Sequence, residues 1–211
     1  PMQAIAPMAL DHEKWEGKFT SLVPDEGWEQ PDFDDKYWQL SEGAFGTPGM
    51  WEARTQWTSS NIWVRREVEV DPYLLEHKKI YLRYSHDDVF QLYVNGMQLV
   101  STGYEWKSDL RVNIPDSIAE TMKDGKAVIA AHCENRMGGA LVDFGLYAEL
   151  REAEQTSVDV QATQTHYTFE CGDVELKLSF TAPYLLDDLK TLARPVNYIS
   201  YQAKALDGKE H

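Results

Sequence analysis

The clearest hydrophobic pattern in the chain runs from residue 80 to residue 100. Apolar side chains occupy every second position of residues 80–84 and again of residues 90–94. A period of two predicts strands with one buried face. Asn95-Gly96 follows the second strand. Because Asn-Gly readily adopts the positive φ angles of a type I′ turn, we expect a two-residue hairpin here.

The same alternation recurs on both sides of this hairpin, and helical periodicity is almost absent. Further strands are predicted over these segments: 61–70, 110–114, 127–133 and 140–150. One helical turn is expected over 117–122. A large antiparallel, all-β domain over residues 14–150 therefore follows from the pattern. Residues 1–13 are expected to be a linker.

The pattern restarts after a charged stretch over 151–154, which we interpret as a second linker. Strands are predicted within 157–169, 174–180 and 196–205. Three or four strands are too few to close a sandwich, so residues 155–211 are expected to be the start of a truncated second β domain. Its unpaired edges predict an aggregation or dimer contact in the isolated chain.

The net charge of the chain limits the classes of binding partner that we expect. The 211 residues carry a formal net charge of −15. A surface this acidic repels phosphate backbones and anionic membranes, so neither nucleic acid nor a membrane surface is an expected partner. No apolar run reaches the roughly 20 residues of a membrane span, and no signal peptide is evident. The two ends suggest a piece cut from a longer protein.

Several motifs occur in the order found in one known family of domains. They are Phe33-Asp34-Asp35 with Trp38, Ile62-Trp63-Val64-Arg65-Arg66, Asp87-Asp88 with Leu92-Tyr93-Val94-Asn95-Gly96, and Val128-Ile129-Ala130. Together they resemble the sugar-binding jelly roll of family 2 glycoside hydrolases, a galactose-binding-like β-sandwich. The resemblance covers residues 14–150 and implies a non-catalytic module that packs beside a catalytic barrel.

The second half resembles a different family. The phrases that carry the resemblance are Val158-Asp159-Val160-Gln161, Phe180-Thr181-Ala182-Pro183, Asp187-Asp188-Leu189, Arg194-Pro195-Val196-Asn197 and Asp207-Gly208-Lys209-Glu210-His211. They are similar to the start of the N-terminal β domain of glutaminase A-like proteins, over about 155–211. Such proteins are large and exported by bacteria and fungi, so the resemblance implies a secreted or periplasmic protein with a C-terminal helical toroid.

Three acidic pairs invite a glycosidase interpretation, namely Asp34-Asp35, Asp87-Asp88 and Asp187-Asp188. Hydrolysis needs two carboxyl groups that face one bond, about 5 to 10 Å apart. Neighbours on an extended chain point to opposite sides, so turn formation is the better explanation. Asp87 and Asp88 are also weak calcium candidates, although calcium prefers six to eight oxygen ligands. No other cofactor is expected.

The best candidates for binding are aromatic residues in predicted loops. They are Trp51, Trp57, Tyr104 and Trp106, with Arg54 between the first two. Aromatic rings stack on the C–H faces of sugars, and neighbouring polar groups fix the orientation. The alternative is that these rings cap the sandwich or pack against another domain.

Two hypotheses remain open. In the first, the chain is a non-catalytic scaffold of a glutaminase A-like hydrolase, and it docks the helical toroid and the other domains of the same polypeptide. In the second, it is a carbohydrate-binding module of a glycoside hydrolase. A free-standing hydrolase is the least favoured, since a fold alone confers no chemistry.

Overall fold

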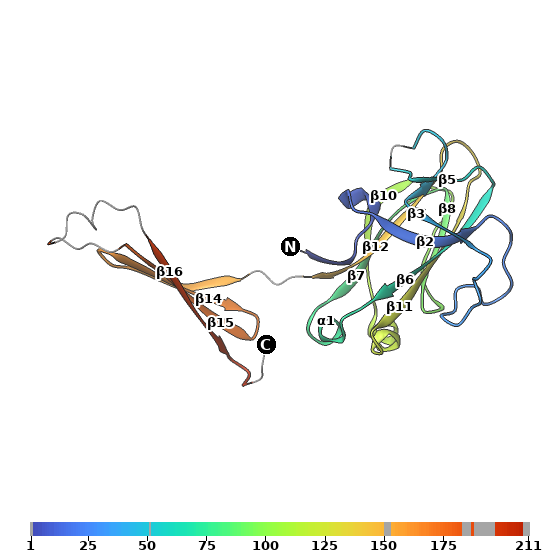
Figure 1. The fold of residues 1–211 in the computed structure, drawn as a ribbon. Coiled ribbons are helices and arrows are strands. Elements are labelled where there is room, and N and C mark those ends of the chain that lie inside the picture. The colour runs from blue at the N-terminus through green and yellow to red at the C-terminus, as the bar shows by residue number, and fades with distance from the viewer. Residues whose placement is uncertain (1, 51, 150–152, 183–186, 188–196, 209–211) are drawn as a thin grey trace. The chain divides into compact units, whose positions relative to one another are not determined.

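The computed structural model describes residues 2–50, 52–149, 153–182, 187 and 197–208. The chain divides into two compact units, residues 2–150 and residues 151–211 (Figure 1).

The first unit consists of two six-stranded sheets. One sheet has the order β10-β7-β12-β4-β5, with β1 also paired to β12. Its strands are β1 (Met2–Ala6), β4 (Phe45–Gly46), β5 (Thr55–Gln56), β7 (Ile80–Asp87), β10 (Lys107–Asn113) and β12 (Leu141–Glu149). The pair β4–β5 is parallel, and the other pairs are antiparallel.

The second sheet has the order β3-β2-β6-β11-β8-β9 and is antiparallel throughout. Its strands are β2 (Trp15–Thr20), β3 (Gln39–Gly43), β6 (Asn61–Glu69), β8 (Val89–Val94), β9 (Met97–Ser101) and β11 (Lys126–Glu134). The short helices of the unit are η1 (Ala9–Asp11), α1 (Pro72–His77), α2 (Asp116–Ala119) and η2 (Glu120–Met122). The predicted all-β sandwich and the helical turn near 117–122 are both confirmed.

The hairpin predicted from Asn95-Gly96 is also confirmed. Val94 pairs with Met97 across the turn. Asn95 has φ 46° and Gly96 has φ 81°, as a type I′ turn requires. The Asn95 amide oxygen accepts a hydrogen bond from the backbone N–H of Val128 at 2.7 Å, which ties the turn to β11.

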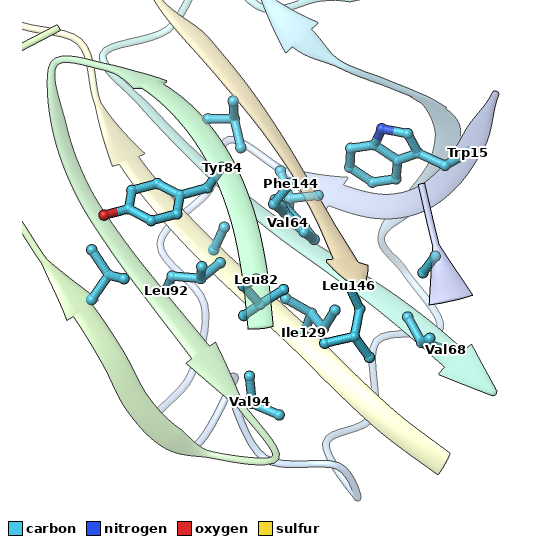
Figure 2. Packing of buried hydrophobic residues seen from close by; sticks show 14 of the residues in the cluster. Trp15, Val64, Val68, Leu82, Tyr84, Leu92, Val94, Ile129, Phe144 and Leu146 are labelled. Atoms are coloured by element: carbon cyan, nitrogen blue, oxygen red, sulfur yellow. The ribbon is translucent and has the colours of Figure 1, made fainter. Parts of the chain in front are cut away.

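The inner faces of the two sheets make one hydrophobic core (Figure 2). Leu82, Phe144 and Leu146 enter it from one sheet, and Leu92 and Ile129 enter it from the other. All five side chains are fully buried. Burying one such side chain contributes about 1.5–3 kcal/mol, so the alternation that predicts the strands also specifies the packing between them.

The predicted linker over residues 1–13 is wrong. Met2–Ala6 forms β1, which pairs with the last strand of the sandwich, so that Met2 lies opposite Glu149. Met8 is buried, and its backbone N–H donates to the hydroxyl of Tyr147 at 2.9 Å. The partners of this segment lie about 140 positions away, and a local hydrophobic pattern carries no trace of them.

A buried carboxylate holds the same segment. Asp143 on β12 accepts hydrogen bonds from the backbone N–H groups of Ala9 at 3.0 Å and Leu10 at 2.9 Å, and from the indole N–H of Trp15 at 2.9 Å. Arg66 donates to two backbone carbonyls nearby. Burial lowers the pKa of Arg66 to about 10, so the guanidinium remains charged at neutral pH.

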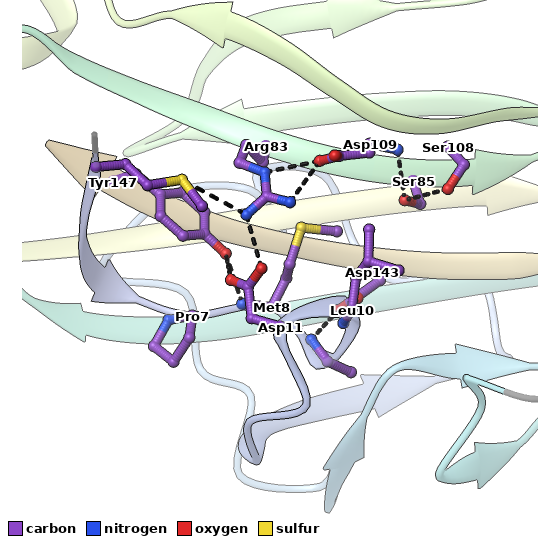
Figure 3. A network of polar contacts seen from close by, with 12 residues as sticks. Pro7, Met8, Leu10, Asp11, Arg83, Ser85, Ser108, Asp109, Asp143 and Tyr147 are labelled. Carbon is purple, nitrogen blue, oxygen red and sulfur yellow. Dashed lines mark hydrogen bonds and ion pairs between the residues drawn. The ribbon is translucent and has the colours of Figure 1, made fainter. Parts of the chain in front are cut away.

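Arg83 makes a second polar link at the outer face of the sandwich (Figure 3). Its guanidinium contacts Asp11 at 2.7 Å and Asp109 at 2.6 Å, which join the N-terminal segment to β10. The hydroxyl of Tyr147 also donates to Asp11. The contact between Arg83 and Asp11 is the better shielded of the two, since the Asp109 side chain is 50% exposed, and it helps to fix the position of the segment.

Asp35 shows what one acidic pair of the sequence does. Its carboxylate pairs with Arg65 at 2.9 Å and with Lys18 at 2.5 Å. Burial alone would raise the pKa of Asp35, but the hydrogen bonds from Lys18 and Arg65 outweigh it and hold the pKa below its usual value. Asp34 binds Lys36 at the surface. Both carboxylates therefore fix local structure.

The second unit contains a four-stranded antiparallel sheet of order β13-β14-β15-β16. The strands are β13 (Glu154–Val160), β14 (Gln164–Cys171), β15 (Val174–Thr181) and β16 (Tyr198–Ala205). Glu154, predicted as linker, already begins β13, and residues 151 and 152 lie outside the described residues. No residue that the structure describes in this unit is buried. The predicted antiparallel strands of this unit are confirmed.

Candidate functional site

Four connections meet at one end of the sandwich, which we call the loop end. They are residues 47–60, 87–88, 102–106 and 135–140. Ala140 donates its backbone N–H to the hydroxyl of Thr47 at 2.9 Å. Asn135 donates its backbone N–H to the carbonyl of Ser60 at 2.7 Å. The described residues that are predicted to bind sugar or calcium all belong to these connections.

Asp88 holds one of these loops in place. It is buried, and its carboxylate accepts the backbone N–H groups of Arg136 at 2.7 Å and Met137 at 3.2 Å. Burial and the neighbouring Asp88 raise the pKa of Asp87 to about 6. Among the described residues, no three His, Cys, Asp or Glu side chains gather where they could hold a metal ion. The contacts of Asp88 therefore show that its carboxylate organises this loop.

The structure corrects the prediction for Trp57. Its side chain is 2% exposed and lies in the hydrophobic core. The indole N–H donates to the carbonyl of Ser59 at 2.5 Å. Because β5 pairs with β4 beside this residue, the ring turns inward and offers no face to a sugar. Arg54 is exposed in the same loop, and Trp51 lies outside the described residues.

Tyr104 and Trp106 lie where stacking is feasible. Their side chains are 53% and 62% exposed, in the connection between β9 and β10. Arg136 lies near Tyr104. The hydrogen bond from Arg136 to Glu134 is the main cause that raises the pKa of Arg136, with smaller contributions from Asp88 and Tyr104. Two exposed aromatic rings thus share the loop end with a fixed cation.

Three buried acceptor atoms, two in the loop end and one next to it on β7, have no hydrogen-bond partner among the described residues. They are Glu52 Oε2, His86 Nε2 and Asn135 Oδ1. His86 Nδ1 lies 2.9 Å from the carbonyl of Asp88. Because a carbonyl only accepts, Nδ1 carries the proton, and Nε2 of the neutral ring is an acceptor. Burial lowers the pKa of His86, which favours this neutral form.

The sequence gives no signal for Glu52 or Asn135. Both stand in connections without periodicity, and single polar residues in loops are common. Only the tertiary contacts of the loop end remove their oxygens from solvent. His86 stood next to the predicted calcium candidates, but its position in the core follows from the alternation of β7.

His132 and Cys133 are adjacent in the sequence and could be taken for a base and a nucleophile, but the structure does not bring them together. Their side chains lie on opposite faces of β11, as neighbours in a strand must. His132 stacks on Trp63 with centroids 4.6 Å apart, and its Nε2 lies 2.8 Å from Asn61 Oδ1. Cys133 donates to the carbonyl of Asp87 at 3.2 Å, and burial raises the pKa of its thiol. The protonated thiol is no nucleophile.

Comparison with known proteins adds a family match and several structural likenesses. A family model described as a domain of unknown function (DUF5127) matches residues 163–211. No curated protein matches the chain. No helix among the described residues has the length and apolar character of a membrane span.

The solved structures that resemble the chain include glycoside hydrolases. A β-glucuronidase of Bacteroides uniformis has 15% identity and a TM-score of 0.48, over 92% of this chain and 26% of that one. A family 2 glycosyl hydrolase of Bacteroides cellulosilyticus DSM 14838 has 10% identity and a TM-score of 0.46, over 92% and 30%. Lactobacillus rhamnosus β-glucuronidase has 12% identity and a TM-score of 0.46, over 85% and 35%.

The chain therefore spans between about a quarter and a third of the length of these enzymes. At such identities and TM-scores the likeness assigns neither a family nor a function to the chain. The all-β sandwich is established by its own strand pairing, and the function has to be argued from the loop end.

Proposed function

We propose that this chain is a non-catalytic accessory region of a larger hydrolase and that its jelly roll binds carbohydrate at the loop end. One observation carries the proposal: exposed Tyr104 and Trp106 share the loop end with buried acceptors that find no donor among the residues that the structure describes. Sugars offer apolar C–H faces for stacking and hydroxyl groups for donation, and they suit both features.

The charge of the chain favours a neutral sugar. Glu52 contributes one of the unpartnered acceptors, and the whole chain is acidic. An anionic sugar would meet repulsion, whereas neutral hydroxyl groups would donate to Glu52 and Asn135. This would be carbohydrate recognition without a reaction, because none of the described acidic pairs is arranged for hydrolysis.

Calorimetry and a glycan array on the whole chain test the proposal. We expect binding with a Kd of millimolar or tighter, and Trp106→Ala should weaken it about tenfold through loss of a stacking face. Tyr73→Ala is the matched control, because Tyr73 is a partly exposed aromatic residue on α1, which follows the other end of β6. Absence of binding in the unaltered chain, or an equal loss in Tyr73→Ala, refutes carbohydrate binding.

Assays of the same purified chain for glycosidase and glutaminase turnover test the non-catalytic part. Measurable turnover would overturn it. The glutaminase A-like parent, the helical toroid as docking partner and a secreted or periplasmic location rest on sequence resemblance alone. They remain predictions, since the domain that matches residues 163–211 has no known function.

A further inference from the structure

The sheet β13–β16 has one apolar face and one polar face. Directly paired residues in neighbouring strands point to the same face. One such row crosses all four strands as Val158, Tyr167, Leu178 and Tyr201. The adjacent row, which points to the other face, is Asp159, His166, Ser179 and Ser200. The register therefore separates apolar from polar side chains completely in these rows.

The two faces also differ in the contacts of their side chains: the polar face contains a side-chain hydrogen bond, whereas the apolar face is exposed. On the polar face, His166 Nδ1 lies 2.7 Å from the hydroxyl of Ser179. On the apolar face, Tyr201 is 77% exposed and Ile199 is 66% exposed. A hollow of about 440 Å³ opens between the aromatic and aliphatic side chains of Tyr167 and Phe180. Among the described residues of its own unit, a surface with these properties has no second layer over it.

We infer that this apolar face is the interface of a symmetric dimer with a second copy of the same chain. Two sheets stack face to face at about 10 Å when both inner faces are apolar. A second copy supplies a face of identical character, and the apolar row carries no charge that a two-fold axis would place against itself.

The available area is sufficient for a specific contact. Four strands of about eight residues cover roughly 500 Å² at the usual strand spacing and rise. Two such faces would bury on the order of 1,000 Å² in total, the lower limit of specific interfaces. The net charge of −15 on each copy opposes the approach, so dimerisation should strengthen as salt screens the repulsion.

Sedimentation equilibrium of the full chain tests this inference, with Tyr201→Lys as the disrupting variant and Gln202→Lys as its matched control. The two positions are adjacent in β16, both are exposed, and they point to opposite faces. We expect a monomer–dimer equilibrium whose Kd rises at least about tenfold in Tyr201→Lys, because two aromatic contacts are lost at once. Gln202→Lys should change the Kd less than about threefold.

Three results would overturn the inference. They are a monomer at about 100 μM in 0.5 M salt, an open series of larger assemblies in place of a closed dimer, and equal weakening by both lysine variants. None of these depends on whether the loop end binds sugar, so the dimer and the carbohydrate site can fail separately.

Discussion

The two units use the same alternation of side chains with different results. In residues 2–149 two sheets face each other, and Leu82 and Phe144 are fully buried between them. In residues 153–208 the alternation is equally regular, yet Phe180 and Tyr201 remain exposed. Period-two patterning is therefore enough to specify a sheet and its faces. Stability requires a second layer, because apolar area contributes only when it leaves water.

The largest expected effect is the difference in stability loss when one large apolar side chain is truncated in each unit. Phe144→Ala should cost about 3–5 kcal/mol of unfolding free energy, because it leaves a cavity next to Trp15. Phe180→Ala, measured at a concentration below dimerisation, should cost less than about 1 kcal/mol. Urea unfolding followed by tryptophan fluorescence and by far-UV circular dichroism compares them.

Tryptophan fluorescence isolates the first unit, because all 7 tryptophans of the chain precede residue 107. The comparison between the units would break down if Phe180→Ala shifted the fluorescence transition as far as Phe144→Ala does.

An intermediate effect concerns Asp87 and pH. Burial and the proximity of Asp88 raise the pKa of Asp87 to about 6 in the folded chain, against about 3.9 when unfolded. The folded state therefore holds a proton that the unfolded state has released between these values. The stabilising effect of this proton is complete below pH 4 and is lost as the pH rises to 6.

Asp87→Asn should remove this loss and stabilise the first unit by about 1 kcal/mol at pH 7, less than the full pKa shift corresponds to, because solvent screens part of the interaction at this incompletely buried group; little change is expected at pH 4. The measurement is fluorescence-monitored urea unfolding at both values. Asp159→Asn in β13 is the control in the second unit. If the pH dependence of Asp87→Asn equals that of the unaltered chain, the proposed cause is wrong.

The smallest expected effect concerns the reactivity of the single cysteine in each unit. Cys133 is buried, and Cys171 is exposed on β14. Ellman's reagent should label one thiol per native chain rapidly and the second only after unfolding, because burial both shields Cys133 and raises the pKa of its thiol. Cys171→Ser should leave no fast thiol and change stability by less than about 0.5 kcal/mol. Two fast thiols would show that the sandwich opens at the loop end.

The elements that the sequence predicts well are specified by neighbours in the chain. Asn95-Gly96 forms its turn because two adjacent residues contain all the information needed. The strands β7 and β15 follow in the same way from their own alternation. Local pattern and final structure agree wherever the period of two is strong, even in β7, whose partner β12 is distant in sequence.

The elements that the sequence misses depend on distant partners. β1 is a strand because β12 lies beside it, and Asp143 is a structural carboxylate because Ala9 and Leu10 come to it from the other end of the domain. The sequence predicts that Trp57 lies in an open loop, but pairing between β4 and β5 places it in the core. Of the candidate site, the sequence gives the exposed rings Tyr104 and Trp106 and not the buried acceptors.

The pairing of Met2 with Glu149 has a mechanical consequence. The entry and the exit of the sandwich are neighbouring antiparallel strands, so a force that separates residues 2 and 149 pulls across their shared hydrogen bonds. The hydrogen bonds then break one after another, and β1 separates from β12 at a low force. Tension between those two points would strip off this strand before it could strain the rest of the sandwich.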